Sequence, residues 1–132
     1  MMRVSTAKVD ITPTRATNPY LAGYGVDDPR RASSDTPHSP LYARCLVLWD
    51  DGHPNAIVSV DVLSLPRSMH QAIRQRVVAL HTSWVSSDFA ILYSHTHNGP
   101  VLRDRPDPYT LYNLPPDTSL VESYSNWLDH LG

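Results

Sequence analysis

The sequence predicts an α/β fold of the α+β type, in which one helix joins strands of a mixed sheet. Short apolar runs rich in branched and aromatic residues predict strands near 3–9, 41–49, 55–61 and 88–94. Between the last two runs, apolar residues recur at helical spacing and predict a helix near 66–81. The chain has 132 residues, 41% of them hydrophobic, which suits one ordinary domain with a single core.

The first strand is closed by a proline, because Pro13 biases Thr12 toward an extended backbone. A long loop follows, since residues 14–40 have little periodicity and many prolines and glycines.

The next two strands form a hairpin, with turn residues from Asp50 to Pro54. Arg44 interrupts the first strand of that hairpin, so it either faces solvent at an edge or pairs with an anion.

The predicted helix begins near Pro66, which fits a first helical turn because it needs no hydrogen-bond donor there. Ser64 is a candidate cap for this helix. The apolar stripe expected to face the core consists of Met69, Ile73, Val77 and Leu80. If strands 55–61 and 88–94 are parallel, this helix is their crossover, and Asp61 and His95 then leave the sheet at the same edge.

The last part of the chain is expected to form a second helix near 118–131. Its apolar spacing fits 3.6 residues per turn, and Asp117 or Thr118 could cap it. The apolar stripe of this helix needs a partner to cover it. We therefore expect residues 1–132 to be a partial domain that is truncated at its C-terminus.

Charge and composition exclude several classes of protein. The formal net charge is −2 and the arginines are scattered, so a nucleic-acid surface is not expected. Cys45 is the only cysteine, which excludes an internal disulfide, and its apolar setting favours an inert thiol. No run is long enough for a membrane span, and no signal peptide is visible, which suggests the cytoplasm.

The segment from Ser94 to Pro100, Ser-His-Thr-His-Asn-Gly-Pro, carries the strongest chemical signal. In an extended backbone, residues two apart point to the same face, so His95 and His97 would direct both imidazoles into one space. Two convergent imidazoles at a strand end suit a zinc site. The alternative is a pair of histidines in a polar loop.

A carboxylate follows the neighbouring strand. Asp61 ends the apolar run Val58-Ser59-Val60 and therefore needs a partner. Three roles fit it: orienting an imidazole from behind a metal site, binding a metal weakly, or capping the turn into the helix.

Several segments in order resemble the N-terminal part of the catalytic domain of the neutral/alkaline, non-lysosomal ceramidase family. They are Val9-Asp10-Ile11-Thr12-Pro13, Leu41-Tyr42-Ala43-Arg44, Val58-Ser59-Val60-Asp61 and His95-Thr96-His97-Asn98-Gly99-Pro100. The last is the most specific, although the family usually has serine where this chain has Asn98. The resemblance covers residues 4–128.

This resemblance implies a zinc-dependent amidase that cleaves the N-acyl bond of ceramide, giving a fatty acid and a sphingoid base. It implies that His95 binds Zn²⁺ and that His97 lies beside the metal and polarises the substrate carbonyl. The family completes its zinc site with a second histidine, a glutamate and a tyrosine from much later in a longer domain. Since a catalytic zinc needs three protein ligands, we expect the chain alone to lack amidase activity.

Two other functions compete with this interpretation. Metal-dependent amidohydrolases built on a (β/α)₈ barrel also place His-x-His at a strand end, but such barrels need about 250 residues. The other is a non-catalytic fragment with a vestigial site. The substrate is also left open, because a related N-acyl compound is an alternative to ceramide.

Overall fold

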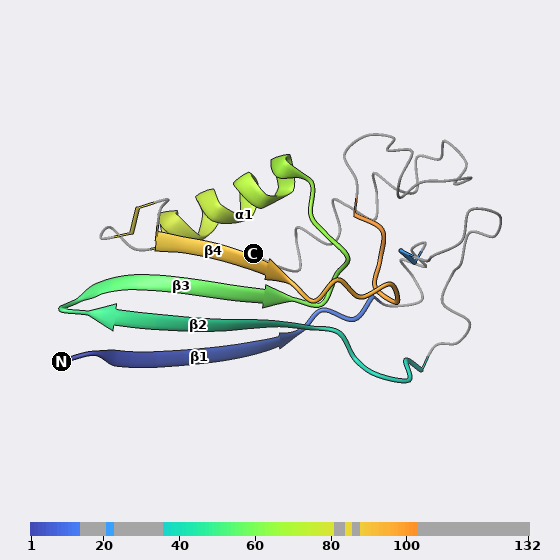
Figure 1. Ribbon diagram of the computed structural model, residues 1–132, viewed down its shortest axis with the longest axis horizontal. Helices are drawn as coiled ribbons and strands as arrows, with labels where there is room; N and C mark the ends of the chain where they lie inside the picture. The colour runs from blue at the N-terminus through green and yellow to red at the C-terminus, as the bar shows by residue number, and fades with distance from the viewer. Residues whose placement is uncertain (14–20, 23–35, 81–83, 86–87, 103–132) are drawn as a thin grey trace.

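The computed structural model describes residues 1–13, 21–22, 36–80, 84–85 and 88–102 (Figure 1). Within these ranges the chain forms a four-stranded mixed sheet and one helix, as the sequence predicts. The predicted helix at 118–131 lies outside the described residues. The elements in chain order are β1 (Arg3–Asp10), β2 (Tyr42–Asp50), β3 (His53–Val60), α1 (Arg67–Ala79) and β4 (Phe89–Tyr93).

The strands lie in the order β1-β2-β3-β4 (Figure 1). The pairs β1–β2 and β2–β3 are antiparallel, whereas β3 and β4 are parallel. Helix α1 is therefore the crossover between two parallel neighbours, as expected. The antiparallel half of this sheet differs from the all-parallel β/α repetition of a (β/α)₈ barrel, so it argues against that alternative.

The hairpin between β2 and β3 is tighter than the sequence predicted. Strand β3 begins at His53 instead of near residue 55, which leaves Asp51 and Gly52 as a two-residue turn. Both turn residues have positive φ, 45° at Asp51 and 88° at Gly52. Positive φ at both positions is the geometry that Asp-Gly favours, because this turn matches the twist of the strands.

Two details of the helix prediction were wrong. Pro66 is the N-cap, and among the described residues no side chain caps this helix end, so Ser64 does not have the expected role. At the other end the helix stops at Ala79, and Leu80 is 82% exposed instead of facing the core. Met69, by contrast, is fully buried and Ile73 packs against the core, as predicted.

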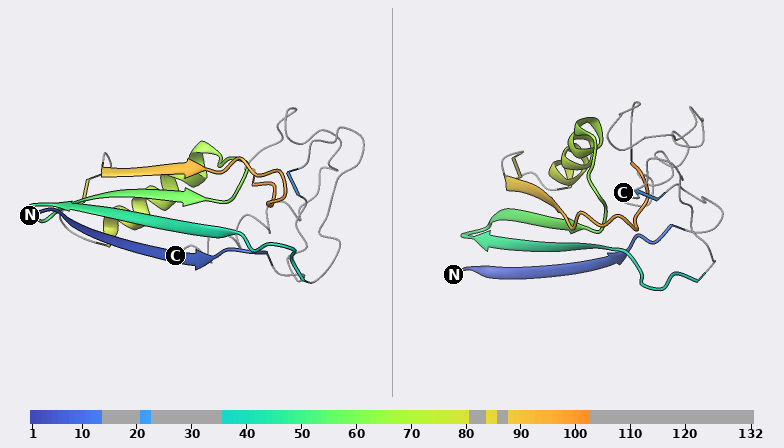
Figure 2. Two further views of the ribbon diagram at one scale, coloured as in Figure 1. Left: turned by 60° about the horizontal axis from the view of Figure 1, so that its bottom comes forward. Right: turned by 45° about the vertical axis from the view of Figure 1, so that its right-hand side comes forward.

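The core lies between α1 and one face of the sheet, where Figure 2 shows the helix beside β3 and β4. Met69 connects the helix to strand residue Val60 and to Val62, both essentially inaccessible to solvent. The buried cluster consists of Ile11, Val60, Val62, Leu65, Met69 and Leu102.

No helix in the described ranges is both long and apolar enough to traverse a bilayer.

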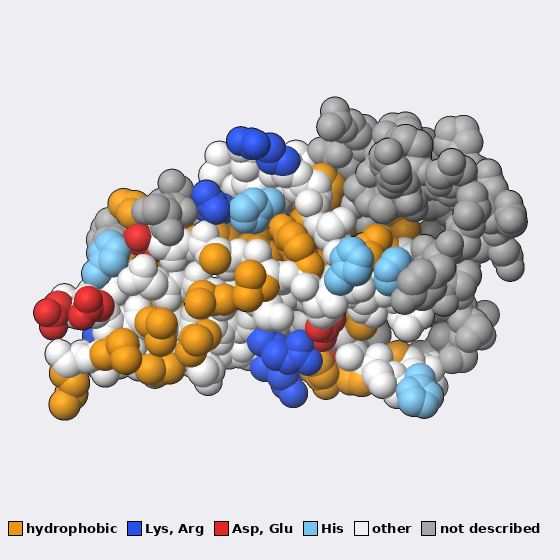
Figure 3. All heavy atoms as spheres, viewed as in Figure 1, with side chains coloured by type: hydrophobic (Ala, Val, Ile, Leu, Met, Phe, Trp, Pro, Cys, Tyr) orange, Lys and Arg blue, Asp and Glu red, His pale blue; other side chains and the backbone are white. Residues whose placement is uncertain are grey.

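The other face of the sheet is open. Ile57 on β3 is 37% exposed and Leu92 on β4 is 54% exposed, and every residue of β1 is exposed. Figure 3 shows hydrophobic side chains gathered over the strands, with lysine and arginine side chains beside them. Helix α1 thus covers part of one face, and the apolar residues of the opposite face contact solvent.

Candidate metal centre

Strands β3 and β4 end side by side. Their parallel register pairs Val60 with Tyr93, and the backbone N–H of Ser94 donates to the carbonyl of Val60 at 3.0 Å. The residues that follow, Asp61 and His95, therefore leave the sheet at the same edge, as the sequence predicts. In open α/β sheets the carboxyl edge of parallel strands is where functional sites are built.

The two histidines converge, but not because they share an extended strand. Strand β4 already ends at Tyr93, and His95 has a φ of 58°, in the left-handed region. His97 lies in the following turn. Their ring centroids are nonetheless 5.3 Å apart, with the ring planes at 87°. The sequence pattern thus predicted the convergence, whereas the backbone that produces it is a kink instead of a strand.

The environments of the two imidazoles differ. His95 is exposed, and its Nδ1 atom lies 3.2 Å from the carbonyl oxygen of Leu63 in the loop between β3 and α1. His97 is half-buried, and its Nδ1 atom is inaccessible to solvent. One ring is therefore available at the surface, and the other is partly buried beside it with its plane nearly perpendicular.

Asp61 holds the start of β2 and the side chain of Arg44. Its carboxylate oxygen Oδ2 accepts the backbone N–H of Tyr42 and the Nη1 donor of Arg44, both at 2.9 Å. Arg44 therefore pairs with an anion, the second of the two roles that the sequence left open. Its side chain is 47% exposed, but β2 is an inner strand, so Arg44 does not lie at an edge of the sheet. The expected action of Asp61 on an imidazole or a metal stays a prediction.

The pKa of Asp61 reflects opposing influences. Partial burial raises the pKa of this carboxyl, but the Tyr42 amide, the Arg44 guanidinium and the Ser94 hydroxyl together outweigh burial. The net result is a pKa below the ordinary aspartate value. Because the carboxyl titrates lower in the folded than in the unfolded chain, its ionised form contributes stability above about pH 4. That contribution is lost as the pH falls through the folded-state pKa.

We expect Asp61→Asn to reduce the free energy of unfolding by about 1 kcal/mol at pH 7, because the ionic partner of Arg44 is lost. The deficit should shrink as the pH falls below about 4, where the wild-type carboxyl also loses its charge. Urea unfolding from about pH 7 to pH 3 measures both effects. Asp51→Asn, at an exposed turn position, is the matched control. An Asp61→Asn deficit that stays constant across this range would contradict the assignment.

The segment from Ser94 to Pro100, here called the histidine loop, is packed closely against the loop that follows β3. A Cβ atom placed on Gly99 would lie 3.1 Å from the carbonyl oxygen of Asp61 and 3.3 Å from Cγ2 of Thr96. A side chain at this position would therefore crowd the two loops, which favours glycine here. The Gly99 carbonyl also accepts the N–H of Ala22 at 2.9 Å. The sequence predicted a turn at Gly99-Pro100, but it gave no signal for the contacts with Ala22 or Leu63.

The described residues do not by themselves make up a metal site. Within these ranges no group of three or more His, Cys, Asp or Glu side chains is arranged to hold an ion. A catalytic zinc takes three protein ligands, so the histidine pair alone would not complete such a site. The donor type nevertheless fits zinc, because a neutral imidazole nitrogen is among its commonest ligands.

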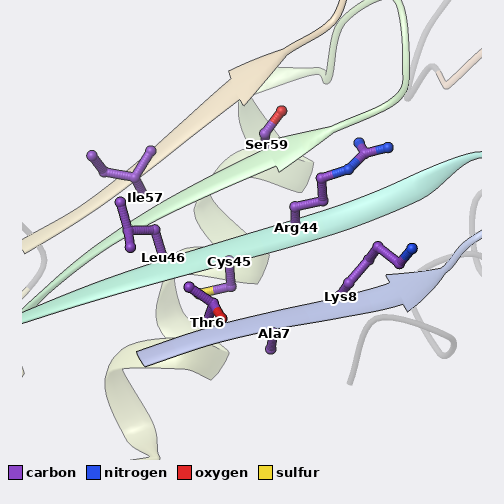
Figure 4. A pocket seen from close by; sticks show the side chains of 8 residues that line it. All are labelled: Thr6, Ala7, Lys8, Arg44, Cys45, Leu46, Ile57 and Ser59. Carbon is purple, nitrogen blue, oxygen red and sulfur yellow. The ribbon is translucent and has the colours of Figure 1, made fainter. Parts of the chain in front are cut away.

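A shallow hollow of about 420 Å³ lies on the open face of the sheet. Figure 4 shows Lys8, Arg44 and Ser59 toward one end of this hollow, and Leu46 and Ile57 toward the other. Neither histidine lines it. Arg44 lines the hollow and is bonded to Asp61, which leaves the sheet at the same end as His95.

No protein-family model matches the chain, and no curated protein matches its sequence. Solved structures do match it. Neutral ceramidase from Pseudomonas aeruginosa superposes with a TM-score of 0.70 and 21% identity, over 98% of this chain and 20% of that one. A ceramidase complexed with C2 superposes with a TM-score of 0.69 and 21% identity, also over 98% of this chain and 20% of that one. The chain thus spans about one fifth of the length of these proteins and has the fold of that neutral ceramidase region.

Proposed function

We propose that this chain supplies the N-terminal part of the catalytic domain of a ceramidase-like hydrolase. The reaction would cleave the N-acyl bond of ceramide or a related N-acyl compound and release a fatty acid and a sphingoid base or amine. One observation supports this most: His95 and His97 converge at the carboxyl edge of the β3–β4 pair, in a chain with a neutral ceramidase fold.

In this proposal the two histidines have different tasks. His95 is the zinc ligand, since its ring is exposed and its Nδ1 atom, 3.2 Å from the carbonyl oxygen of Leu63, is placed to leave Nε2 for a metal. His97 lies 5.3 Å away and would donate a hydrogen bond to the carbonyl oxygen of the substrate as negative charge develops there. A bound zinc ion would supply Lewis-acid chemistry for amide hydrolysis.

We expect the chain to bind zinc weakly and His95→Ala to lower the affinity at least about tenfold, because a direct ligand is lost. Competition against a chromophoric chelator measures this affinity. His38→Ala is the matched control, since His38 is exposed and contacts Ser39. Equal affinities for wild type and His95→Ala, or no binding at high micromolar zinc, would instead favour a vestigial site.

The same preparation tests catalysis. With zinc added, hydrolysis of a fluorogenic ceramide analogue by the isolated chain should stay at the background rate, because the described residues hold no three-ligand cluster. Zinc-dependent turnover that is lost in His95→Ala would show that the chain is an amidase on its own. It would contradict the expectation that further ligands are needed.

A further inference from the structure

We propose that the backbone carbonyl of Leu63 fixes the tautomer and the orientation of His95, so that Nε2 is the ring atom presented to a ligand. The two groups are 3.2 Å apart, from the carbonyl oxygen of Leu63 to Nδ1 of His95. A carbonyl oxygen can only accept, so this contact is a hydrogen bond only when Nδ1 carries the proton. In the neutral ring the lone pair is then on Nε2.

The backbone of His95 supports this role. A φ of 58° is uncommon for a residue other than glycine and persists only where the surrounding structure imposes it. The kink turns the chain directly after β4, where the N–H of Ser94 is still bonded to the Val60 carbonyl at 3.0 Å. Strand pairing therefore fixes the residue before the kink.

A second contact holds the far side of the same loop. Gly99 packs against the Asp61 carbonyl so closely that a Cβ atom would lie 3.1 Å from its oxygen. Asp61 is itself fixed, because its N–H donates to the Tyr42 carbonyl at 2.9 Å. The end of β3 and the loop after it thus contact the histidine loop at Val60, Asp61 and Leu63. Along the histidine loop, the Leu63 contact at His95 falls between the backbone contacts at Ser94 and Gly99.

The neighbouring imidazole does not duplicate this geometry. The His97 ring is nearly perpendicular to that of His95, at 87°, and is half-buried. The contact with the Leu63 carbonyl oxygen is made by Nδ1 of His95. Leu63 is a positioning residue, acting through His95, and the identification of the ligand as a metal ion rests on the proposed function.

The tautomer can be measured directly on the metal-free chain. Long-range proton–nitrogen NMR spectra of ¹⁵N-histidine protein at about pH 8, where an ordinary imidazole is neutral, distinguish a protonated ring nitrogen from an unprotonated one. We expect His95 to carry its proton on Nδ1. A proton on Nε2 would overturn the inference, whatever the chain does with zinc.

Zinc added to the same sample separates this inference from the proposed function. If both are correct, zinc shifts the Nε2 signal of His95 and leaves the proton on Nδ1. If the Nδ1 tautomer is present but zinc causes no shift, the proposed function fails and the positioning by Leu63 stands. Loss of the Nδ1 proton on zinc binding would show that the metal takes Nδ1 and would overturn the inference.

Two variants test the hydrogen bond itself. Asparagine and glycine both tolerate positive φ, but only asparagine has an amide nitrogen close to the place of Nδ1. We expect the thermal midpoint of His95→Gly to lie about 4 °C below that of His95→Asn, as one lost hydrogen bond predicts. Neither variant should keep the zinc affinity of the wild type. Equal midpoints would count against a bond to Leu63.

Discussion

Replacing Met69 by alanine is expected to destabilise the fold by about 3 kcal/mol, the largest effect predicted for any substitution in this chain. Met69 is fully buried and lies in the cluster that joins α1 to Val60 and Val62. Removing its side chain loses apolar burial and leaves a cavity where the helix meets the sheet. Since domains of this size have only about 5–15 kcal/mol of stability, the loss is a large share of the total.

Urea unfolding followed by circular dichroism measures this loss. Leu80→Ala is the matched control, because Leu80 is also a large apolar residue but is 82% exposed at the end of the same helix. It should change the free energy of unfolding by less than about 0.5 kcal/mol. Similar losses for the two variants would mean that α1 does not dock through Met69.

Gly99→Ala is expected to cost about 2 kcal/mol, because one added methyl group overpacks the histidine loop. The new Cβ would lie 3.1 Å from the carbonyl oxygen of Asp61. That oxygen cannot easily move, since both the N–H and the carboxylate of Asp61 are bonded to Tyr42. We expect the loop to shift instead, which would also change the distance from His95 to Leu63.

The second close neighbour of this Cβ offers a control. Thr96→Ser removes Cγ2, 3.3 Å from the added methyl, and keeps the hydroxyl that accepts the Asn98 N–H at 3.2 Å. In a double-mutant cycle followed by urea unfolding, Thr96→Ser should recover a minor part of the Gly99→Ala loss. Full recovery would assign the strain to Thr96, and no loss in Gly99→Ala would show that the loops are loosely packed.

Most of the fold could be predicted from the sequence, because its elements have strong local signals. Alternation and apolar runs predicted β1, β2 and β4 to within about two residues, and helical periodicity predicted α1. The errors lie at the ends of elements, where a single residue decides the boundary. The Asp51-Gly52 turn needs only two residues, so β3 begins at His53, and α1 ends before the last residue of its apolar stripe, Leu80.

The candidate site was less predictable, because its geometry depends on contacts between distant residues. The His-x-His pattern and the parallel β3–β4 pair predicted where the imidazoles meet. The positive φ of His95 and the acceptor provided by Leu63 have no local signature, since they arise only when two loops pack together. Asp61 has Arg44 and Tyr42 as partners, and such pairing cannot be read from spacing alone.

The parallel pairing of β3 and β4 has a consequence for the order of folding. Strands β2 and β3 are neighbours across a two-residue turn, so their hairpin closes a very short loop. The contact from Leu63 to His95 spans 32 residues and must wait for the crossover helix and β4. Contacts of long sequence separation form slowly because loop closure costs entropy before they are made. We therefore expect the histidine pair to be among the last features to assemble, after the hairpin has formed.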